Sequence, residues 1–214
     1  MAMTSTMKRI PIPFWKYSKW LERLSHDAPH RVSDFAKSFS ENQVYAKSWL
    51  IERLMMHSFA NKKEKEIWIL GSWYGTILVP LLMSKFSDIF KIHLVDFDEE
   101  TLSIAERLWY TKTQFGNLIH THCMDINFDF DKLHGDLIIN TSCEHMLPMD
   151  QFDCKGLCAF QSNNFREEMA HINCVDSLEE FIEQTGIRDI YYSGKIPFHT
   201  YDDHHERYMV IGER

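Results

Sequence analysis

The stretch EIWILGSWYGTILVPLLMSKFSDIFKIHLVDFD, residues 66–98, decides the fold of this chain. Residues 67–70 are a short apolar run, long enough for a buried strand but too short for a helix. Gly71 and Gly75 follow, where a chain that leaves a strand must turn tightly. Residues 76–86 are a mostly apolar helical segment, and residues 92–95 form a second apolar run. The stretch therefore predicts one β-α-β unit.

Asp96 closes the second strand of this unit. An acidic side chain at that position can accept hydrogen bonds from both hydroxyls of a ribose. The glycine turn and the N-terminus of the helix then face the rest of the ligand. The unit therefore predicts a site for a cofactor that contains a nucleoside.

The spacing of the glycines separates two cofactor classes. A dinucleotide fingerprint that starts at Gly71 needs glycines where the chain has Trp73 and Thr76, so an NAD-dependent oxidoreductase is a distant alternative. The shorter Gly-x-Gly-x-Gly frame resembles motif I of the class I S-adenosylmethionine-dependent methyltransferases. Gly71 and Gly75 match its first and third glycines, and Trp73 replaces the middle one. Ile69 stands where that family usually carries an acid, so the contact to the methionine amino group must come from elsewhere.

Further segments extend the resemblance over residues 66–212. The sequence LVDFD looks like motif II, in which the first acid, here Asp96, binds the ribose and the next side chain, Phe97, packs on the adenine. Met124 and Asp125 stand where the family places its adenine pocket. Asp125 is equally well explained as an acid of a loop.

Residues 136–146, DLIINTSCEHM, look like motif IV, whose end lies beside the transferable methyl group in that family. The resemblance implies that Asn140 orients the substrate and that Glu144 and His145 are candidate general bases. Both can instead be structural, by capping the next helix or bonding to the backbone. We expect cofactor contacts from the following residues: Gly71, Ser72, Trp73, Gly75, Asp96, Phe97, Met124, Asp125, Asn140, Thr141 and Lys47.

Lys47 lies on the helix that leads into the first strand. Its ammonium group can reach the methionine carboxylate of the cofactor. The alternative is a solvated lysine on a helix face.

The rest of the chain alternates strands with helices, which predicts an α/β fold. We expect a three-layer, Rossmann-like, seven-stranded and mostly parallel sheet, with a helical cap over residues 1–62 and the cofactor domain over residues 63–214. Ser40 and Gln43 predict a capping box at the start of the second helix of this cap. The further strands are expected at residues 117–123, 136–140 and 156–161, with an antiparallel edge hairpin at 187–193 and 207–211, and the helices at 14–24, 99–110 and 177–184.

Composition narrows the class of partner. The 214 residues carry a formal net charge of -8 and no block of lysine or arginine, which disfavours a nucleic-acid surface. The sequence has no apolar run long enough to span a membrane. Five cysteines, an odd number, do not predict a disulfide framework, so we infer a reducing compartment and a cytoplasmic protein.

The histidines and cysteines give no metal motif by their spacing. His171 with Cys174, Cys154 with Cys158, and His120 with His122 could each be half of a site. None has the paired spacing of a structural zinc motif, so we predict no metal.

The sequence thus predicts an S-adenosylmethionine-dependent methyltransferase that acts on a small molecule. Two alternatives stay open: a module that binds the cofactor without catalysis, and an enzyme that transfers the aminocarboxypropyl group of the same cofactor.

Overall fold

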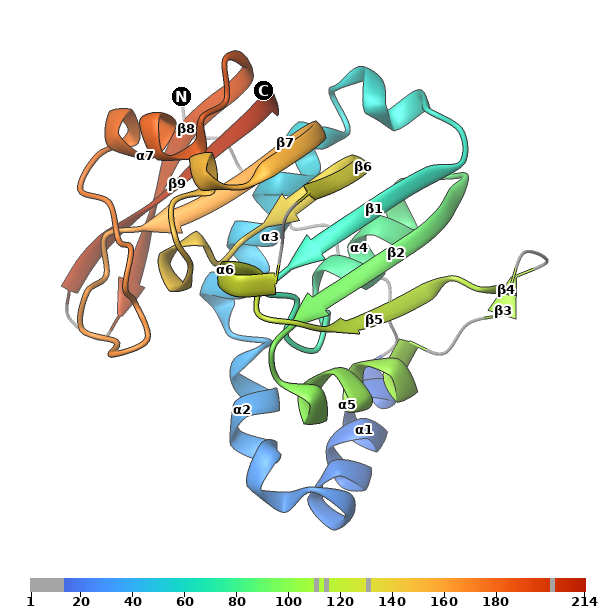
Figure 1. Ribbon diagram of the computed structural model, residues 1–214. Helices are drawn as coiled ribbons and strands as arrows, with labels where there is room; N and C mark the ends of the chain where they lie inside the picture. Colours follow the sequence, from blue (N-terminus) through green and yellow to red (C-terminus); the bar gives the residue numbers. More distant parts are fainter. Residues whose placement is uncertain (1–13, 110–111, 114–115, 130–131, 201–202) are drawn as a thin grey trace, which may run out of the picture.

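The structure, a computed structural model, describes residues 14–109, 112–113, 116–129, 132–200 and 203–214 (Figure 1). One seven-stranded sheet organises them, with the strand order β5-β2-β1-β6-β7-β9-β8. The strands are β1 (Lys65–Leu70), β2 (Ile89–Asp96), β5 (Ile119–Cys123), β6 (Lys132–Asn140), β7 (Asp153–Asn163), β8 (Asp189–Thr200) and β9 (Asp203–Glu213).

The sheet is parallel except at one edge, as predicted. The pairs β1–β2, β1–β6, β2–β5 and β6–β7 are parallel. Strand β9 runs antiparallel to both β7 and β8, and β8 and β9 form the predicted hairpin. In this register Asn163, the last residue of β7, pairs with Arg207, which places Arg207 beside the carboxyl end of β7.

Helices form a layer on each side of the sheet (Figure 1). One core cluster joins α3 (Glu41–Leu54), α4 (Leu78–Lys85) and α5 (Glu99–Trp109) to one face, through residues such as Leu50, Leu82 and Ile69. A second cluster joins α6 (Ile126–Asp129) and α7 (Leu178–Thr185) to the other face, through residues such as Phe160 and Phe181. The alternation of these core residues along each strand gives the three-layer α/β fold.

The N-terminal helices α1 (Phe14–Asp27) and α2 (Val32–Lys37), joined by η1 (Pro29–Arg31), pack against α5 and the turn after β1. The rings of Trp20 and Trp109 lie 5.2 Å apart, and those of Phe35 and Tyr74 lie 5.1 Å apart. Helix α3 shares the core of the sheet instead. The division of the chain at residue 62 remains a prediction, and residues 1–13 of that cap lie outside the described residues.

Two helix starts have the predicted caps. Asp98 accepts a hydrogen bond from the Thr101 N–H at 3.1 Å, and Ser177 accepts one from the Glu180 N–H at 3.1 Å. The prediction of a capping box at Ser40 is wrong, because the Ser40 side chain makes no cap hydrogen bond in the described part of the chain. The sequence did not predict α2, α6, the small pair β3 (Lys112–Thr113) and β4 (Gly116–Asn117), or the 3-10 turns η2 (Ser58–Asn61), η3 (Cys143–His145) and η4 (Met149–Gln151).

All five cysteines are free, and four of them are buried. Within the described ranges, none of the helices has both the length and the apolar character that a membrane span requires.

Candidate functional site

The candidate site lies at the carboxyl edge of the parallel strands. Because β1, β2, β5, β6 and β7 are parallel, the segments that follow them meet at one edge of the sheet (Figure 1). The predicted residues end or follow β1, β2, β5 and β6 in turn, and Lys47 is on α3, where the charges of Glu144 and Arg207 act on it. The sheet therefore brings the predicted set to one region of the molecule.

The turn after β1 depends on its two glycines. Gly71 and Gly75 have φ angles of +57° and +64°, which L side chains rarely adopt. A Cβ atom at Gly71 would lie 2.6 Å from the Met146 side chain, and one at Gly75 would lie 2.9 Å from Val79. Ser72 is buried between them, and its N–H bonds to the Val95 carbonyl at 3.0 Å. A side chain in place of either glycine would therefore force neighbouring atoms to move.

Trp73 takes the place of the middle glycine and also has a positive φ, +50°. Such a conformation costs about 1 kcal/mol or more for a residue with a side chain. Two hydrogen bonds hold it: the Trp73 N–H donates to Asp96 Oδ2 at 2.8 Å, and the indole Nε1–H donates to Asp34 Oδ2 at 3.0 Å. Trp73 is therefore built into the turn as a structural replacement for glycine.

Asp96 faces this turn from the end of β2. Its Oδ2 accepts from Trp73, and its Oδ1 accepts from the Asp98 N–H at 3.2 Å. Burial raises the pKa of the Asp96 carboxyl group above its ordinary value. Since each carboxylate oxygen can accept a second hydrogen bond, the group has the capacity to bind two hydroxyl donors.

Exposed aromatic side chains follow the carboxyl ends of β2 and β5. Phe97 is 76% exposed, and Phe128, on the unpredicted helix α6, is 86% exposed. The Met124 N–H bonds to the Asp96 carbonyl at 3.0 Å, which joins the ends of β5 and β2. Asp125 Oδ1 accepts from the Asn127 N–H at 2.9 Å, so one of its oxygens caps the start of α6.

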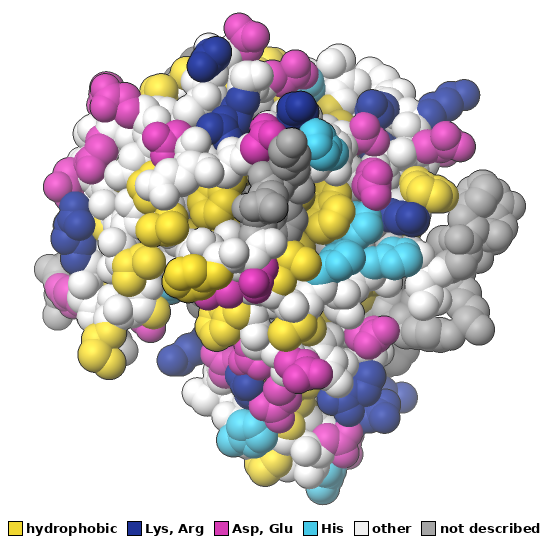
Figure 2. Space-filling view, in the orientation of Figure 1, with side chains coloured by type: hydrophobic (Ala, Val, Ile, Leu, Met, Phe, Trp, Pro, Cys, Tyr) yellow, Lys and Arg dark blue, Asp and Glu magenta, His cyan; other side chains and the backbone are white. Residues whose placement is uncertain are grey.

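Exposed apolar side chains continue along the same edge, after β6 and β7. Leu147 is 38% exposed, and Ile172 is 64% exposed. Figure 2 shows apolar side chains across this face and a hollow in the outline at the lower left, above the lobe that holds α1 and α2. An apolar rim of this kind favours a ligand with planar or apolar groups.

Asn140 ends β6 but turns its side chain into the core. Its Nδ2 donates to the sulfur atoms of Met146 and Met149 at 3.1 and 3.2 Å, and its Oδ1 accepts from the Ser142 N–H at 2.9 Å. The described contacts of Asn140 thus shape the loop after β6 and do not present its amide to a substrate. Thr141 is buried, and its carbonyl accepts from Arg207 Nη1 at 3.4 Å.

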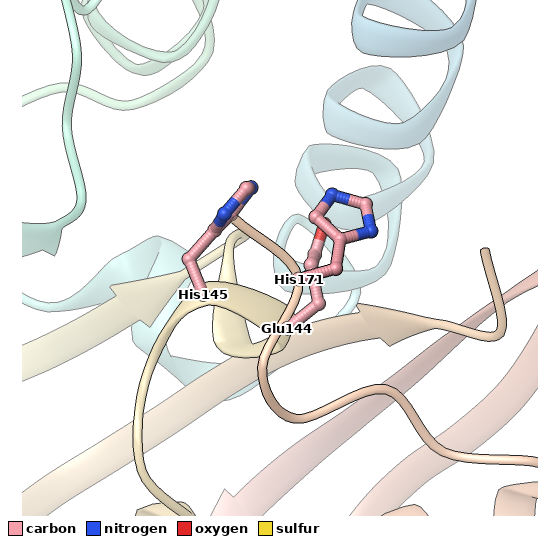
Figure 3. Close-up of side chains that lie close together, drawn as sticks. All are labelled: Glu144, His145 and His171. Atoms are coloured by element: carbon pink, nitrogen blue, oxygen red, sulfur yellow. The ribbon is translucent and has the colours of Figure 1, made fainter. Parts of the chain in front are cut away.

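Glu144 and His145 follow in the turn η3. Glu144 is buried; its Oε1 accepts from Asn163 Nδ2 at 2.6 Å and lies 3.7 Å from Arg207 Nη2. His145 is exposed, and its ring centroid lies 4.5 Å from that of His171, which comes from the loop after β7. Figure 3 shows the side chains of Glu144, His145 and His171 on the same side of the loops that carry them. The predicted pair therefore has a third partner that spacing did not reveal.

Lys47 belongs to the same polar group. Burial, and next to it the charge of Arg207, lower the pKa of its ammonium group to about 7, while the charge of Glu144 opposes the shift. The ammonium group donates to Gln43 Oε1. Its charged neighbours are therefore Glu144, in the turn after β6, and Arg207, on β9 beside the carboxyl end of β7. A contact of Lys47 with the cofactor remains a prediction.

Two residues before β1 tie the N-terminal helices to the site, and sequence reasoning missed both. Asp34 Oδ2 accepts from the Trp73 indole and, at 2.8 Å, from the Tyr74 hydroxyl. Arg31 pairs with Asp98 at 2.6 Å. No sequence signal marks these contacts, because the partners are far apart in the chain.

A shallow cavity of about 390 Å³ lies elsewhere, at the amino ends of β7 and β8. His57, Arg188 and Tyr191 are among its lining residues. None of the candidate residues lines it, so it gives no support to the site at the carboxyl edge.

The sequence matches no protein-family model, and no curated protein matches it. Solved structures do match its fold. The N-methyltransferase NodS from Bradyrhizobium japonicum WM9, in complex with S-adenosyl-L-homocysteine, gives a TM-score of 0.56 at 13% identity, over 93% of this chain and 99% of that chain. The magnesium protoporphyrin IX methyltransferase ChlM from Synechocystis PCC 6803, with bound S-adenosylmethionine, gives 0.53 at 12% identity, over 92% of this chain and 91% of that chain. These likenesses confirm the predicted resemblance in fold to class I methyltransferases.

Proposed function

We propose that this protein binds S-adenosylmethionine at the carboxyl edge of its sheet and transfers the methyl group to a small molecule. The observation that carries the proposal is the Asp96 carboxylate, which faces a glycine turn in a sheet with the methyltransferase fold. The turn and the carboxylate come from adjacent parallel strands, which is the arrangement that binds nucleosides in such sheets.

The adenosine half of the cofactor fits the β1–β2–β5 side of the edge. Asp96 accepts from the ribose hydroxyls, and the exposed ring of Phe97 packs on the adenine. Met124 lies next to Asp96 in the structure and completes the adenine pocket. The second oxygen of Asp125 accepts from the exocyclic amine.

The methyl acceptor, a separate molecule, fits the β6–β7 side of the same edge. Methyl transfer from a sulfonium is an in-line displacement, so the alignment of nucleophile, methyl carbon and sulfur contributes most of the rate. Glu144, His145 and Lys47 supply polar groups on this side that can hold the acceptor and take part in removing its proton.

A small-molecule acceptor agrees with the name of ChlM, a magnesium protoporphyrin IX methyltransferase of similar fold, and with the net charge of -8, which disfavours nucleic acid. The five free cysteines support the predicted location in the cytoplasm.

A second candidate function is binding of the cofactor without turnover. Ile69, where the methyltransferase frame has an acid, is 1% exposed and packs in the core. The carboxyl end of β1 therefore offers no carboxylate to the methionine amino group, and this keeps the binding module as the second candidate.

The test is incubation of the purified full-length protein with methyl-labelled S-adenosylmethionine and fractionated small-molecule extracts. We expect labelled product and S-adenosylhomocysteine, both lost in Asp96→Ala. Binding without turnover in any fraction favours the module, and methylthioadenosine as the product identifies aminocarboxypropyl transfer. No binding at all overturns the proposal.

A further inference from the structure

We propose that Glu144, His145 and His171 form a binding site for a divalent transition-metal ion. Each residue offers one ligand atom, and these atoms all lie within 4.8 Å of one another. Figure 3 shows the three side chains grouped on one side of the loops after β6 and β7. Two imidazoles and one carboxylate are a donor set that binds iron(II), zinc and related ions and leaves further positions open.

The distances suit a site that closes on the ion. Ligand atoms at about 2.1 Å from a tetrahedral ion lie about 3.4 Å from one another. The ligand atoms of the three residues lie within 4.8 Å of one another, so small side-chain movements bring them to this spacing, and the exposed ring of His145 has room to make one.

The two imidazole rings are oriented as metal ligands. His145 Nδ1 lies 3.0 Å from the Ala170 carbonyl, and His171 Nδ1 bonds to the Phe165 carbonyl. A carbonyl oxygen only accepts, so Nδ1 carries the hydrogen atom in both rings. The lone pair of each neutral ring is then on Nε2, the arrangement by which backbone carbonyls orient histidine ligands in metal sites.

Glu144 provides an independent indication of a bound cation. The residue is 3% exposed, and its Oε2 has no hydrogen-bond partner among the residues that the structure describes. Asn163 holds Oε1 at 2.6 Å, and Arg207 is 3.7 Å away, which is long for a hydrogen bond. A buried carboxylate oxygen without a partner is unfavourable, and a metal ion at Oε2 supplies the missing partner.

The backbone fixes the approach of the two loops. The Asn173 N–H bonds to the Glu144 carbonyl at 3.0 Å, and the Val175 N–H bonds to the Asn163 carbonyl at 3.2 Å. These bonds hold the segment that carries His171 beside η3. Spacing in the sequence could not reveal the site, because one ligand comes from a different loop.

A second histidine cluster on the open face of β1, β2 and β5 serves as the comparison. His93 Nδ1 bonds to His122 Nε2 at 2.8 Å, and His93 Nε2 bonds to Glu66 Oε1 at 2.8 Å. Trp68 stacks on His93 with ring centroids 4.0 Å apart. Both ring nitrogens of His93 are thus engaged, so this cluster is a poorer metal site.

The use of the ion in methyl transfer rests on the proposed function. An acceptor hydroxyl that binds the ion loses its proton to solvent more easily. Its oxygen then attacks the methyl carbon while the carbon–sulfur bond breaks and the sulfur keeps the electron pair. The acceptors that suit this site are therefore small molecules with a hydroxyl group that can coordinate a metal ion.

The test is a titration of the metal-free, full-length protein with Co²⁺, followed by its visible absorption, and then displacement by Zn²⁺. We expect one Co²⁺ per chain with absorption bands of a bound ion. His171→Ala and His145→Ala should each weaken binding at least tenfold, and so should Glu144→Gln, while His122→Ala should leave it unchanged. Circular dichroism of each variant checks that it is folded.

Three results would overturn the proposal: no stoichiometric binding, binding that survives His171→Ala, or an equal loss in His122→Ala. These measurements use no adenosyl cofactor. A failure of the metal site is therefore distinguishable from a failure of the proposed methyl transfer, which the binding of S-adenosylhomocysteine tests separately.

Discussion

Asp96 is the residue on which cofactor binding depends most. Its two oxygens already accept one backbone hydrogen bond each, and burial raises the pKa of the carboxyl group. Two donors from a ribose would offset the unfavourable burial of the charge. The carboxylate is therefore set up for a ligand with adjacent hydroxyl groups.

We predict that Asp96→Asn lowers the affinity for S-adenosylhomocysteine about 10- to 100-fold, since a charge-assisted hydrogen bond contributes about 1.5–3 kcal/mol. Calorimetric titration measures the change. Asp136→Asn is the matched control. Asp136 accepts a hydrogen bond from the Glu66 N–H at 2.9 Å, near the amino end of β1, which is the edge of the sheet opposite the candidate site. Equal affinities of Asp96→Asn and the wild type would contradict the prediction.

Lys47 makes the stability of the protein depend on pH. Burial lowers its pKa from 10.5 to about 7. Between these values the unfolded chain holds a proton that the folded chain has released, so the Lys47 contribution raises the free energy of unfolding as the pH rises from 7 to 10.5. Below about pH 7 the folded chain carries a buried, destabilising charge.

We predict that Lys47→Met raises the free energy of unfolding at pH 7 by about 1–3 kcal/mol, and that this gain shrinks as the pH approaches 10. Urea denaturation at a series of pH values measures both effects. Lys63→Met, at an exposed lysine, controls for the loss of one positive charge. A gain that is constant over the pH range would be inconsistent with a buried ammonium group.

At the scale of elements, α2 and the turn after β1 form one unit through Asp34. We predict that Asp34→Asn lowers the free energy of unfolding by about 1–2 kcal/mol, because the Trp73 and Tyr74 donors lose a charged acceptor. Denaturant titration gives the value. Asp27→Asn on α1 weakens exposed pairs with Arg23 and Arg107 and should change stability by less than about 0.5 kcal/mol. Equal effects of the two variants on the free energy of unfolding would refute the link between α2 and the turn.

The turn itself depends on Gly71. We predict that Gly71→Ala destabilises the protein by about 1 kcal/mol or more, because φ is +57° and the new Cβ would lie 2.6 Å from Met146. Thermal unfolding is the measurement. Gly194→Ala on β8 is the control, since the new Cβ there would also lie 2.6 Å from the end of a side chain, the Tyr192 hydroxyl, but the backbone has no positive φ. A larger loss at Gly194 than at Gly71 would show that the turn is less constrained than the structure indicates.

The elements that the sequence predicted are those with a strong local signal. The apolar run before Gly71, the cap residues Asp98 and Ser177, and the edge hairpin all depend on nearby residues, and the structure contains them. Helices α2 and α6 have six and four residues, too short for a helical period to show. Gln43 bonds to Lys47 instead of capping the helix, a choice that tertiary surroundings decide.

At the scale of the whole molecule, the sequence did not reveal the order of the strands in the sheet. It did predict that the strands are mostly parallel, and this is enough to place the site. In a parallel sheet the segment after each strand must reach the carboxyl edge, so residues after β1, β2, β5 and β6 could be predicted as one site. Contacts across long separations could not, such as Asp34 with Trp73 and Glu144 with His171. They depend on how the loops after β6 and β7 and the N-terminal helices pack.

The central claim is that this carboxyl edge binds an adenosyl cofactor. Its most direct test is a calorimetric titration of the folded wild-type protein with S-adenosylhomocysteine. We predict saturable binding of one molecule per chain. The absence of any binding heat over a range of temperatures, from protein whose circular dichroism shows it to be folded, would contradict the claim.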